Sequence, residues 1–421
     1  MRFLIATFGS HGDVHPFIGL AQTLQRRGHS VVLATAAPFA RLVRDAGIEA
    51  VAVGDEQRFD ELTGDPDVWH PRKGGLLILD AVLQTLPETH AAVDEHIAGV
   101  DVVVASTLAL GAKQAAEKHG VPCATVHLQP TVFWSVHAPP RLPGVPAIIN
   151  RMPSFVLERF YDGADKLVID PKIAPGLNDF RAGLGLPPVE RVMSRHVHEG
   201  AAAIGLWPDW FAPRQPDWPK QAALAGFPLY DEADVTPMPE HVHEWIGDDT
   251  PPVAFTPGSA MRHGRRFFET AVRACQHAGV RGLLLTRHAQ NVPPDLPPGM
   301  LHVPYAPFSA LLPRCAALVH HGGIGTMSQA FAAGVPQLVM PMAHDQFDNA
   351  ERMKRLGVGD WVGVRRFTPR RVGRLLGKVI ARREAARELA GKLAGDDGLG
   401  KAADLLEAVA APTGATTRVC H

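Results

Sequence analysis

Two series of short β-type runs, each followed by a helical stretch, constrain the fold of this chain more than any other feature. The first series opens with the continuous apolar run RFLIATF at 2–8 and extends to a run at 202–207. The second series begins at 252–258 and reaches 337–341. Strand–helix alternation produces right-handed βαβ units and a parallel sheet of apolar, buried strands. The sequence therefore predicts an α/β fold with two doubly wound, Rossmann-like parallel-sheet domains.

A segment rich in proline and acidic residues, at 207–240, separates the two series. Such residues interrupt helices and strands, so we expect a boundary here. The predicted organisation is a first domain at 1–220, an inter-domain segment at 221–250 and a second domain at 251–421, with a terminal helix that can return to the first domain. Paired domains of this kind bind ligands between the carboxyl ends of their strands, which predicts a central cleft.

The composition of this 421-residue chain excludes some partners and compartments. Lys and Arg number 42 and Asp and Glu 43, so a net charge of −1 gives no reason to expect nucleic acid. No apolar run reaches the roughly 18 residues of a membrane span, and the start lacks a signal-peptide pattern. Cys123, Cys275, Cys315 and Cys420 stand apart, which is typical of reduced thiols. We expect a cytoplasmic protein, free or peripherally bound to the inner membrane.

The stretch LVHHGGIGTMSQAFAAG at 318–334 places two histidines and three glycines between a strand and a helix. Gly322, Gly323 and Gly325 leave backbone N–H groups open at the helix N-terminus, where the dipole favours an anion. Thr326 adds a hydroxyl in the first turn. A tight turn with packed histidines is the structural alternative. A metal site is disfavoured because adjacent strand residues point to opposite faces and no Cys or carboxylate lies at ligand spacing.

Polar or aromatic residues follow the other strands of the second half. Ser259 ends one strand at another phosphate-type position, and Tyr305 is placed where an aromatic ring can stack on a base. Asp345 and Gln346 come directly after a buried strand, where they can hydrogen-bond the vicinal hydroxyls of a sugar or cap the next helix. A turn serine and a core tyrosine are the structural alternatives for the first two residues.

In this order, these pieces resemble the nucleotide-sugar half of the family 1 glycosyltransferases with the GT-B fold. The motif has an aromatic–Ala–Pro start, a His-Gly-Gly turn, a Gly-Val-Pro and an Asp-Gln end. The resemblance implies an inverting, metal-independent sugar transfer that uses a nucleotide-sugar co-substrate and no cofactor. It implies that His321 and the following turn hold the diphosphate, that the tyrosine faces the base and that Asp-Gln holds the sugar. The implied donor-binding residues are Ser259, Tyr305, His321, Gly323, Gly325, Thr326, Asp345 and Gln346.

The loop FGSHGDVHP at 8–16 carries the candidate base. It is not a GxGxxG loop and no acid ends the second strand, which argues against a dehydrogenase. The resemblance implies that Asp13 takes the proton of the acceptor hydroxyl, with His11 as the competing base. Asp13 can instead cap the predicted helix at 14–28. The strand at 101–106 ends without a carboxylate, so a His–Asp dyad is disfavoured and Asp13 is expected to act alone.

Apolar and aromatic residues at 76–86 and 131–160 suggest a channel for a hydrophobic acceptor, with ordinary helix packing as the alternative. The candidate acceptor-binding residues are Phe133, Trp134, His137, Met152 and Phe155. The HVHE sequences at 196–199 and 241–244 lack the spacing of a metal site, and we expect their histidines to be exposed.

Several segments are also similar to the rhamnosyltransferases of rhamnolipid synthesis, among them TGDPDVWHP at 63–71 and the stretch at 207–231. This similarity implies transfer of L-rhamnose from dTDP-L-rhamnose to a lipidic 3-(3-hydroxyalkanoyloxy)alkanoate, with an acyl-transferring enzyme as a possible partner. The alternatives are transfer from a UDP- or dTDP-sugar to a sterol, polyketide or flavonoid, a sugar-nucleotide epimerase, and a non-catalytic nucleotide-sugar binder. The sequence leaves the oligomeric state open.

Overall fold

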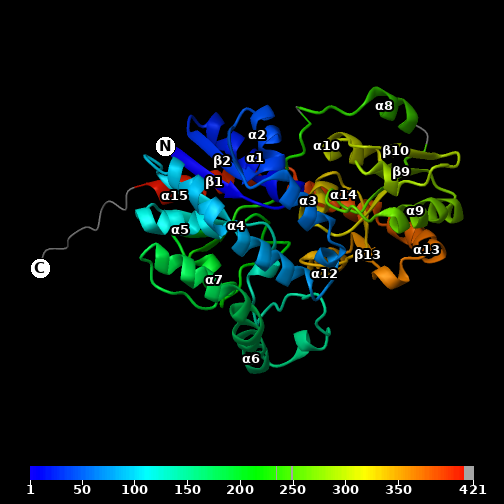
Figure 1. Cartoon of the computed structure of the whole chain (residues 1–421). Helices are drawn as coiled ribbons and strands as arrows, with labels where there is room; N and C mark the ends of the chain where they lie inside the picture. Colours follow the sequence, from blue (N-terminus) through cyan, green and yellow to red (C-terminus); the bar gives the residue numbers. More distant parts are fainter. Residues whose placement is uncertain (234, 248–249, 412–421) are drawn as a thin grey trace, which may run out of the picture.

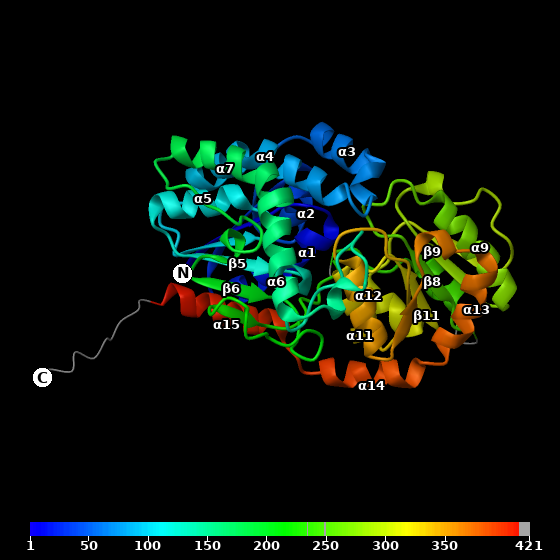
Figure 2. The ribbon, with the colours of Figure 1, turned by 90° about the horizontal axis from the view of Figure 1, so that it is seen from below.

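A computed structural model describes residues 1–233, 235–247 and 250–411, and contains two parallel sheets side by side (Figure 1). The first sheet has seven strands in the order β3-β2-β1-β4-β5-β6-β7, and the second has six in the order β10-β9-β8-β11-β12-β13. Helices cover both faces of each sheet (Figure 2). This arrangement confirms the predicted pair of doubly wound parallel sheets. Cys420 lies outside the described residues.

The first half of the chain builds the seven-stranded sheet. Its strands are β1 (Arg2–Thr7), β2 (Ser30–Ala36), β3 (Glu49–Val53), β4 (Val102–Ser106), β5 (Cys123–His127), β6 (Ala202–Gly205) and β7 (Ala222–Leu224). Its helices are α1 (His11–Arg26), α2 (Ala40–Asp45), α3 (Glu56–Gly64), α4 (Gly74–His96), α5 (Leu110–His119), α6 (Ser154–Ala164) and α7 (Asp170–Gly183). The central strands β1 and β4 are almost fully buried, as their apolar sequences require.

The second half builds the six-stranded sheet. Its strands are β8 (Val253–Thr256), β9 (Gly282–Leu285), β10 (Met300–Val303), β11 (Ala317–His320), β12 (Gln337–Val339) and β13 (Gly359–Trp361). Its helices are α8 (Glu240–Ile246), α9 (Arg265–Ala278), α10 (Phe308–Leu311), α11 (Ile324–Ala332), α12 (Gln346–Arg355), α13 (Pro369–Ile380) and α14 (Arg383–Leu393), and α15 (Gly398–Ala410) follows.

Two strands were not expected from the sequence. β7 at 222–224 lies inside the proline-rich segment, so the first sheet continues past the predicted boundary at residue 220. β13 at 359–361 pairs with β12, whereas the last strand predicted from the sequence was at 337–341. Both are three-residue strands at a sheet edge, too short to show the periodicity that identifies a strand.

The two halves share buried contacts at two places. Phe211 and Phe227 of the first half pack against Phe331 on α11, with Phe227 and Phe331 ring centroids 6.0 Å apart. Helix α15 crosses back along the lower edge of the molecule (Figure 2) and buries Ala402 and Leu406 in the core of the first sheet.

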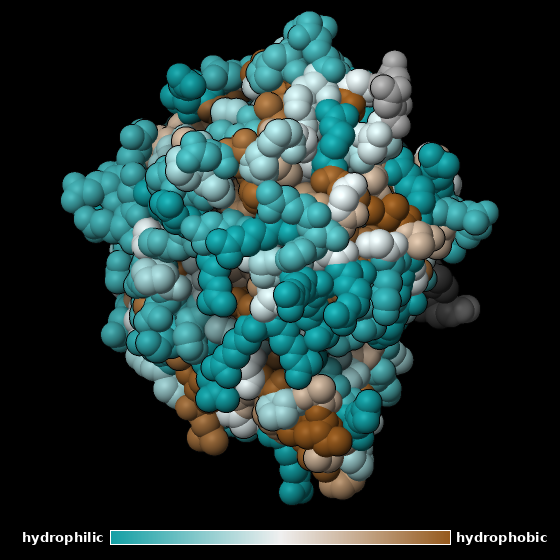
Figure 3. Space-filling model, turned by 90° about the vertical axis from the view of Figure 1, so that its right-hand side faces the viewer, coloured by the Kyte–Doolittle hydropathy of each residue, from teal (hydrophilic) through white to brown (hydrophobic). Residues whose placement is uncertain are grey.

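One side of the molecular surface is mostly hydrophilic, with hydrophobic side chains in small patches (Figure 3). Within the described residues, no helix is both long enough and apolar enough to cross a membrane.

The shared core yields a prediction for stability. Phe331 is 2% exposed, so Phe331→Ala should lower the free energy of unfolding by about 3–5 kcal/mol through lost burial and a cavity. Phe155 is 64% exposed, so Phe155→Ala should change it by no more than about 0.5 kcal/mol. Chemical denaturation of both variants measures the difference, and equal effects would contradict the packing described here.

Candidate active site

The loops with the predicted base and diphosphate residues leave the sheets at topological switch points. β1 lies between β2 and β4, and the chain after β1 carries His11 and Asp13. β8 and β11 are neighbours, and the loops after them carry Ser259 and His321. Ligands of open α/β sheets bind in the crevice at this point. The loop after β9, the neighbour of β8, contacts the loop after β1, because Arg287 Nη1 lies 2.8 Å from His11 Nε2.

Asp13 lies in the first turn of α1, which begins at His11 with Ser10 as its N-cap. Asp13 Oδ2 accepts hydrogen bonds from Ser10 N at 2.7 Å and Ser10 Oγ at 3.1 Å. The carboxylate thus forms half of a capping box, and the helix starts three residues before the predicted position 14. Gly9 is required here, because a Cβ on it would lie 2.3 Å from Oδ2. Burial raises the pKa of Asp13, although the hydrogen bonds from Ser10 oppose the rise.

His11 is neutral and its Nε2 is engaged. Burial, with the charges of His15 and Arg287, lowers the pKa of His11 to about 4. Since an arginine only donates, His11 Nε2 is the acceptor in their contact. Asp13 Oδ1, by contrast, accepts no hydrogen bond from any residue that the structure describes. The geometry therefore favours Asp13 over His11 as the group free to take a proton.

The His321 ring lies against two glycines. A Cβ on Gly258 would lie 2.8 Å from His321 Cε1, and a Cβ on Gly323 would lie 2.5 Å from Nε2. Burial lowers the pKa of His321 to about 4, with a smaller contribution from His344. Nδ1 of His321 is buried and has no partner among the described residues. A fixed, neutral imidazole with one unsatisfied nitrogen fits a site that hydrogen-bonds a ligand.

His320 is fully buried at the end of β11. Its Nε2 lies 2.9 Å from Gln337 Oε1, and its Nδ1 accepts a hydrogen bond from Gly322 N at 3.1 Å. Both ring nitrogens are used within the second domain, so His320 has a packing role.

Asp345 stands at the N-terminus of α12 and faces the first domain. Its Oδ2 accepts a hydrogen bond from Asn349 Nδ2 at 2.5 Å. Burial raises the pKa of Asp345 to about 7, and the charges of Asp13 and Asp348 add to the rise. Asn349 Nδ2 also donates to Gly322 O at 3.0 Å, which joins the start of α12 to the glycine-rich turn before α11. Because the charge of Asp13 contributes to this rise, Asp13, the predicted base, and Asp345, predicted to bind the sugar, interact electrostatically.

Gln346 uses its side-chain oxygen inside its own loop. Oε1 accepts hydrogen bonds from Met342 N at 2.8 Å and Ala343 N at 3.1 Å. This oxygen therefore binds the preceding loop and does not cap α12, and only the amide nitrogen remains for a ligand. Gly325 and Thr326 are half-buried in the first turn of α11.

Tyr305 and Ser259, two of the predicted donor-binding residues, lie in the loops after β10 and β8. The Tyr305 hydroxyl donates to Asp231 O, and the Arg287 guanidinium lies 4.8 Å from the ring centroid. Ser259 is exposed in the loop after β8, and its backbone lies near His288, the residue after Arg287. One face of the tyrosine ring is therefore covered by a cation.

Comparison with known proteins shows the family. Residues 3–137 match the glycosyltransferase family 28 N-terminal domain, and residues 283–402 match the erythromycin biosynthesis protein CIII-like C-terminal domain. The chain is 32% identical over 375 residues to the O-mycaminosyltylonolide 6-deoxyallosyltransferase of Streptomyces fradiae, an alignment that covers 85% of this chain and 84% of that protein. The chain belongs to the GT-B glycosyltransferases.

Solved structures confirm the GT-B fold of this glycosyltransferase. It is similar to the glycotransferase of kitacinnamycin, with a TM-score of 0.72, 23% identity and coverage of 97% of this chain and 98% of the other. It is also similar to the glycosyltransferase VinC in complex with dTDP, with a TM-score of 0.70, 22% identity and coverage of 97% and 99%.

The predicted acceptor residues of the glycosyltransferase do not form one cluster. Phe133 is 3% exposed and stacks on His198 at 4.6 Å and Trp218 at 4.8 Å. This stack buries Phe133 in the core, which corrects its assignment to a channel lining. Trp134 is half-buried with its ring 5.3 Å from that of Tyr161. The other three candidates are exposed, on or near α6: His137, Met152 and Phe155.

The HVHE sequence at 196–199 also differs from expectation. His196 and His198 are both 2% exposed, whereas we expected exposed histidines. His198 Nδ1 lies 3.1 Å from His127 Nε2, and His127 Nδ1 lies 2.9 Å from Thr107 Oγ1. Burial lowers the pKa of His198 to about 4, so this is a neutral network in the interior of the first domain. Among the described residues, no group of three or more His, Cys, Asp or Glu side chains is arranged to hold a metal.

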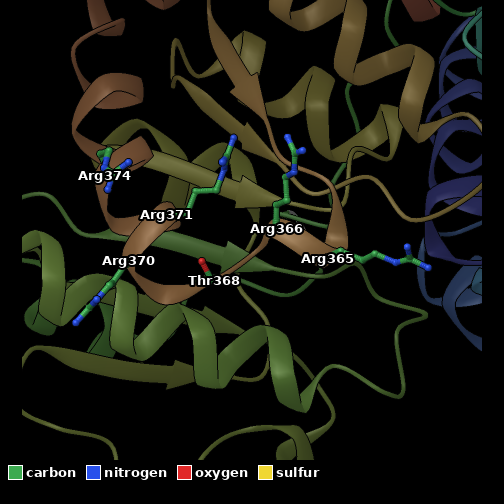
Figure 4. Close-up of a pocket in the computed structure, with 6 residues that line it drawn as sticks. All are labelled: Arg365, Arg366, Thr368, Arg370, Arg371 and Arg374. Atoms are coloured by element: carbon green, nitrogen blue, oxygen red, sulfur yellow. The ribbon is translucent and has the colours of Figure 1, made fainter.

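An arginine-rich hollow lies outside the cleft. It has a volume of about 390 Å³ and lies between the helical turn Val364–Arg366 and the start of α13 (Figure 4). It is lined by Arg365, Arg366, Thr368, Arg370, Arg371 and Arg374. The side chains point in different directions and not to one centre (Figure 4). None of the predicted donor or acceptor residues lines it.

Sequence reasoning missed three residues of the cleft, Asn349, Arg287 and Glu232. Asn349 follows Asp345 by four residues, a helical spacing that would have revealed the pair. Arg287 and Glu232 belong to loops far apart in the sequence, and no spacing pattern joins them.

The raised pKa of Asp345 yields a pH prediction. The folded state binds a proton that the unfolded state has lost between about pH 4 and pH 7, so stability from this group falls as pH rises through that range. Stability measured from pH 4 to 8 should therefore fall for the wild type relative to Asp345→Asn. The slope should be at most about 1.4 kcal/mol per pH unit.

Asp360 is the matched control. Burial opposes ionisation there, but the hydrogen bonds from Lys354 and the Trp361 backbone hold the pKa of Asp360 below its usual range. The difference between the wild type and Asp360→Asn should stay flat above about pH 5. Parallel curves for the wild type and Asp345→Asn would contradict the raised pKa.

Proposed function

We propose that this glycosyltransferase transfers a 6-deoxyhexose from a dTDP-sugar to a hydroxyl of a hydrophobic, polyketide-type aglycone. The observation that carries the proposal is the relationship to the tylonolide 6-deoxyallosyltransferase, which spans both domains at 32% identity. The dTDP complex of VinC, a protein of the same fold, supports the nucleotide. Asp13 of the first domain and Asp345 of the second interact through their charges, which supports a transfer reaction at the cleft.

The narrower assignment to rhamnolipid synthesis has no support from the comparisons, which favour the polyketide alternative. L-Rhamnose is itself a 6-deoxyhexose and stays a candidate sugar. A cytoplasmic location, peripheral membrane binding and delivery of the acceptor by an acyl-transferring enzyme stay predictions.

The donor roles follow the geometry of the second domain. Tyr305 faces the base, and Asp345 with the amide nitrogen of Gln346 holds sugar hydroxyls. The unsatisfied Nδ1 of buried His321 supports a ligand contact there, and the open N-terminus of α11 supports an anion. The proposed diphosphate partners are Ser259, His321, Gly323, Gly325 and Thr326. The acceptor lies on the side of Trp134, His137, Met152 and Phe155.

In the proposed mechanism, Asp13 removes the proton of the acceptor hydroxyl as the oxygen bonds to the anomeric carbon. The bond between that carbon and the diphosphate breaks, and dTDP leaves with the bonding electron pair. Attack from the face opposite the nucleotide inverts the anomeric configuration. The N–H groups at the start of α11 stabilise the charge that develops on the diphosphate. The raised pKa of Asp13 brings a carboxylate closer to the range in which general bases work at neutral pH.

Mass spectrometry of the products tests the function. The enzyme is given a pool of polyketide, sterol, flavonoid and 3-(3-hydroxyalkanoyloxy)alkanoate acceptors, with dTDP-rhamnose and UDP-glucose offered in parallel. We expect a deoxyhexosyl adduct of a polyketide and only with the dTDP-sugar. A rhamnosylated lipid or a glucosylated sterol would overturn the proposed acceptor, and donor binding without any adduct would favour a non-catalytic binder.

The base assignment predicts a large kinetic effect. Asp13→Asn should lower kcat by about 10²- to 10⁴-fold because the amide cannot accept the proton, while dTDP affinity survives. His11→Asn serves as the comparison variant in the same loop. If His11→Asn loses more kcat than Asp13→Asn, His11 and not Asp13 is the base.

The glycine beside His321 predicts a binding effect. Gly258→Ala would place a methyl 2.8 Å from the ring at φ +99°, so His321 must shift. We expect dTDP affinity, measured by calorimetry, to fall about 10- to 100-fold. Gly279→Ala is the matched control, since Gly279 has φ +65° but nothing near its Cβ. Unchanged affinity in Gly258→Ala would exclude His321 from the donor site.

A further inference from the structure

Arg287, in the loop after β9, joins three parts of the cleft. Its Nη1 donates to His11 Nε2 at 2.8 Å, on the acceptor side. Its guanidinium lies 4.8 Å from the ring centroid of Tyr305, on the donor side. Its Nη2 lies 3.9 Å from Oε2 of Glu232, in the segment between the domains. A guanidinium has five N–H donors, so these contacts leave others free.

Glu232 is held in place from both domains. It is 4% exposed and has φ +58°, a left-handed conformation that is strained for a non-glycine residue. Burial favours the neutral acid, but the hydrogen bond with His15 at 2.5 Å and the charge of Arg287 together lower the pKa of Glu232. The preceding Asp231 accepts hydrogen bonds from Tyr305 Oη and from Ser309 N. A strained, ionised carboxylate therefore fixes the position of Arg287.

The residues so far assigned to the proposed diphosphate site include no cation. His321 is neutral at pH 7, because its pKa is about 4, and the glycine-rich turn supplies only backbone dipoles. Arg287 is adjacent in sequence to His288, whose ring lies near the backbone of Ser259 in the loop after β8. The distance of 4.8 Å between its guanidinium and Tyr305 leaves no room for a base between them. A base that stacks on Tyr305 then takes the other face of the ring.

We propose that Arg287 is a donor-binding residue whose guanidinium pairs with the diphosphate of the dTDP-sugar. Glu232 is the positioning residue that keeps this side chain in the cleft. The inference rests on the proposed function and adds a charged group from outside the recognised 305–346 motif. In this proposal Arg287 binds the donor, in addition to the contacts by which it joins the two domains.

The test is calorimetric titration of dTDP into the wild type, Arg287→Ala, Arg287→Gln and Arg287→Lys. The two neutral variants should lose about 10- to 100-fold in affinity, and Lys should restore part of the loss because it keeps the charge. Arg287→Gln keeps most of the side-chain length, so it still tests the proposal if the Ala variant does not fold. Arg262→Ala is the matched control, because Arg262 forms an ion pair with Asp60 across the same two domains.

The outcomes distinguish failure of the Arg287 contact from failure of the proposed dTDP-sugar donor. Unchanged dTDP affinity in Arg287→Gln, with or without a lower melting temperature, would contradict the proposed diphosphate contact. Arg287 would then only hold the two domains together. An equal loss in Arg262→Ala would assign the effect to domain closure and overturn the direct contact. Failure of the wild type to bind dTDP would contradict the proposed donor and, with it, this inference.

Discussion

The packing of Phe227 against Phe331 holds the two sheets in one body, and the geometry of the cleft depends on it. The rings belong to different halves of the chain and lie in a cluster of buried aromatic and aliphatic side chains. A buried ion pair extends the contact, since Asp348 accepts from Arg352 Nε at 2.6 Å and from the backbone of Arg141 at 2.9 Å. With this contact fixed, the carboxyl ends of both sheets face each other, and residues 200 to 300 positions apart in sequence meet in the cleft.

Within that cleft, side chains approach the backbone so closely that glycine is required. Gly9 gives room to the Asp13 carboxylate, and Gly258 and Gly323 give room to the His321 ring. The result is a set of buried groups whose pKa values are shifted toward their neutral forms, with Arg287 and Glu232 as charged members. Such a site presents a proton acceptor on one side and anion-binding groups on the other.

The sequence was sufficient for the α/β architecture and the glycosyltransferase family, because apolar strands and a long ordered motif are properties of the local chain. It was insufficient for β7 and β13, since three-residue edge strands have no measurable period. The burial of Phe133 and His198 depends on a stack with Trp218 that only the tertiary structure brings together. The start of the first helix was predicted three residues late, at 14 and not at 11, because its N-cap is Ser10 and Asp13 is the reciprocal partner in the capping box. Arg287 could not be found at all, as its partners come from three separate segments.

The return of α15 to the first sheet has a consequence for biosynthesis. Ala402, Ala403 and Leu406 lie in the same core as Phe17 and Leu20 of α1, and Arg27 bonds Asp404 at 2.6 Å. The ribosome must therefore have synthesised the second sheet and α15 before the first domain can complete its hydrophobic core. Domains usually fold in the order of their synthesis. Here part of α1 stays exposed until α15 emerges, so the folding of the first domain is coupled to the synthesis of the second.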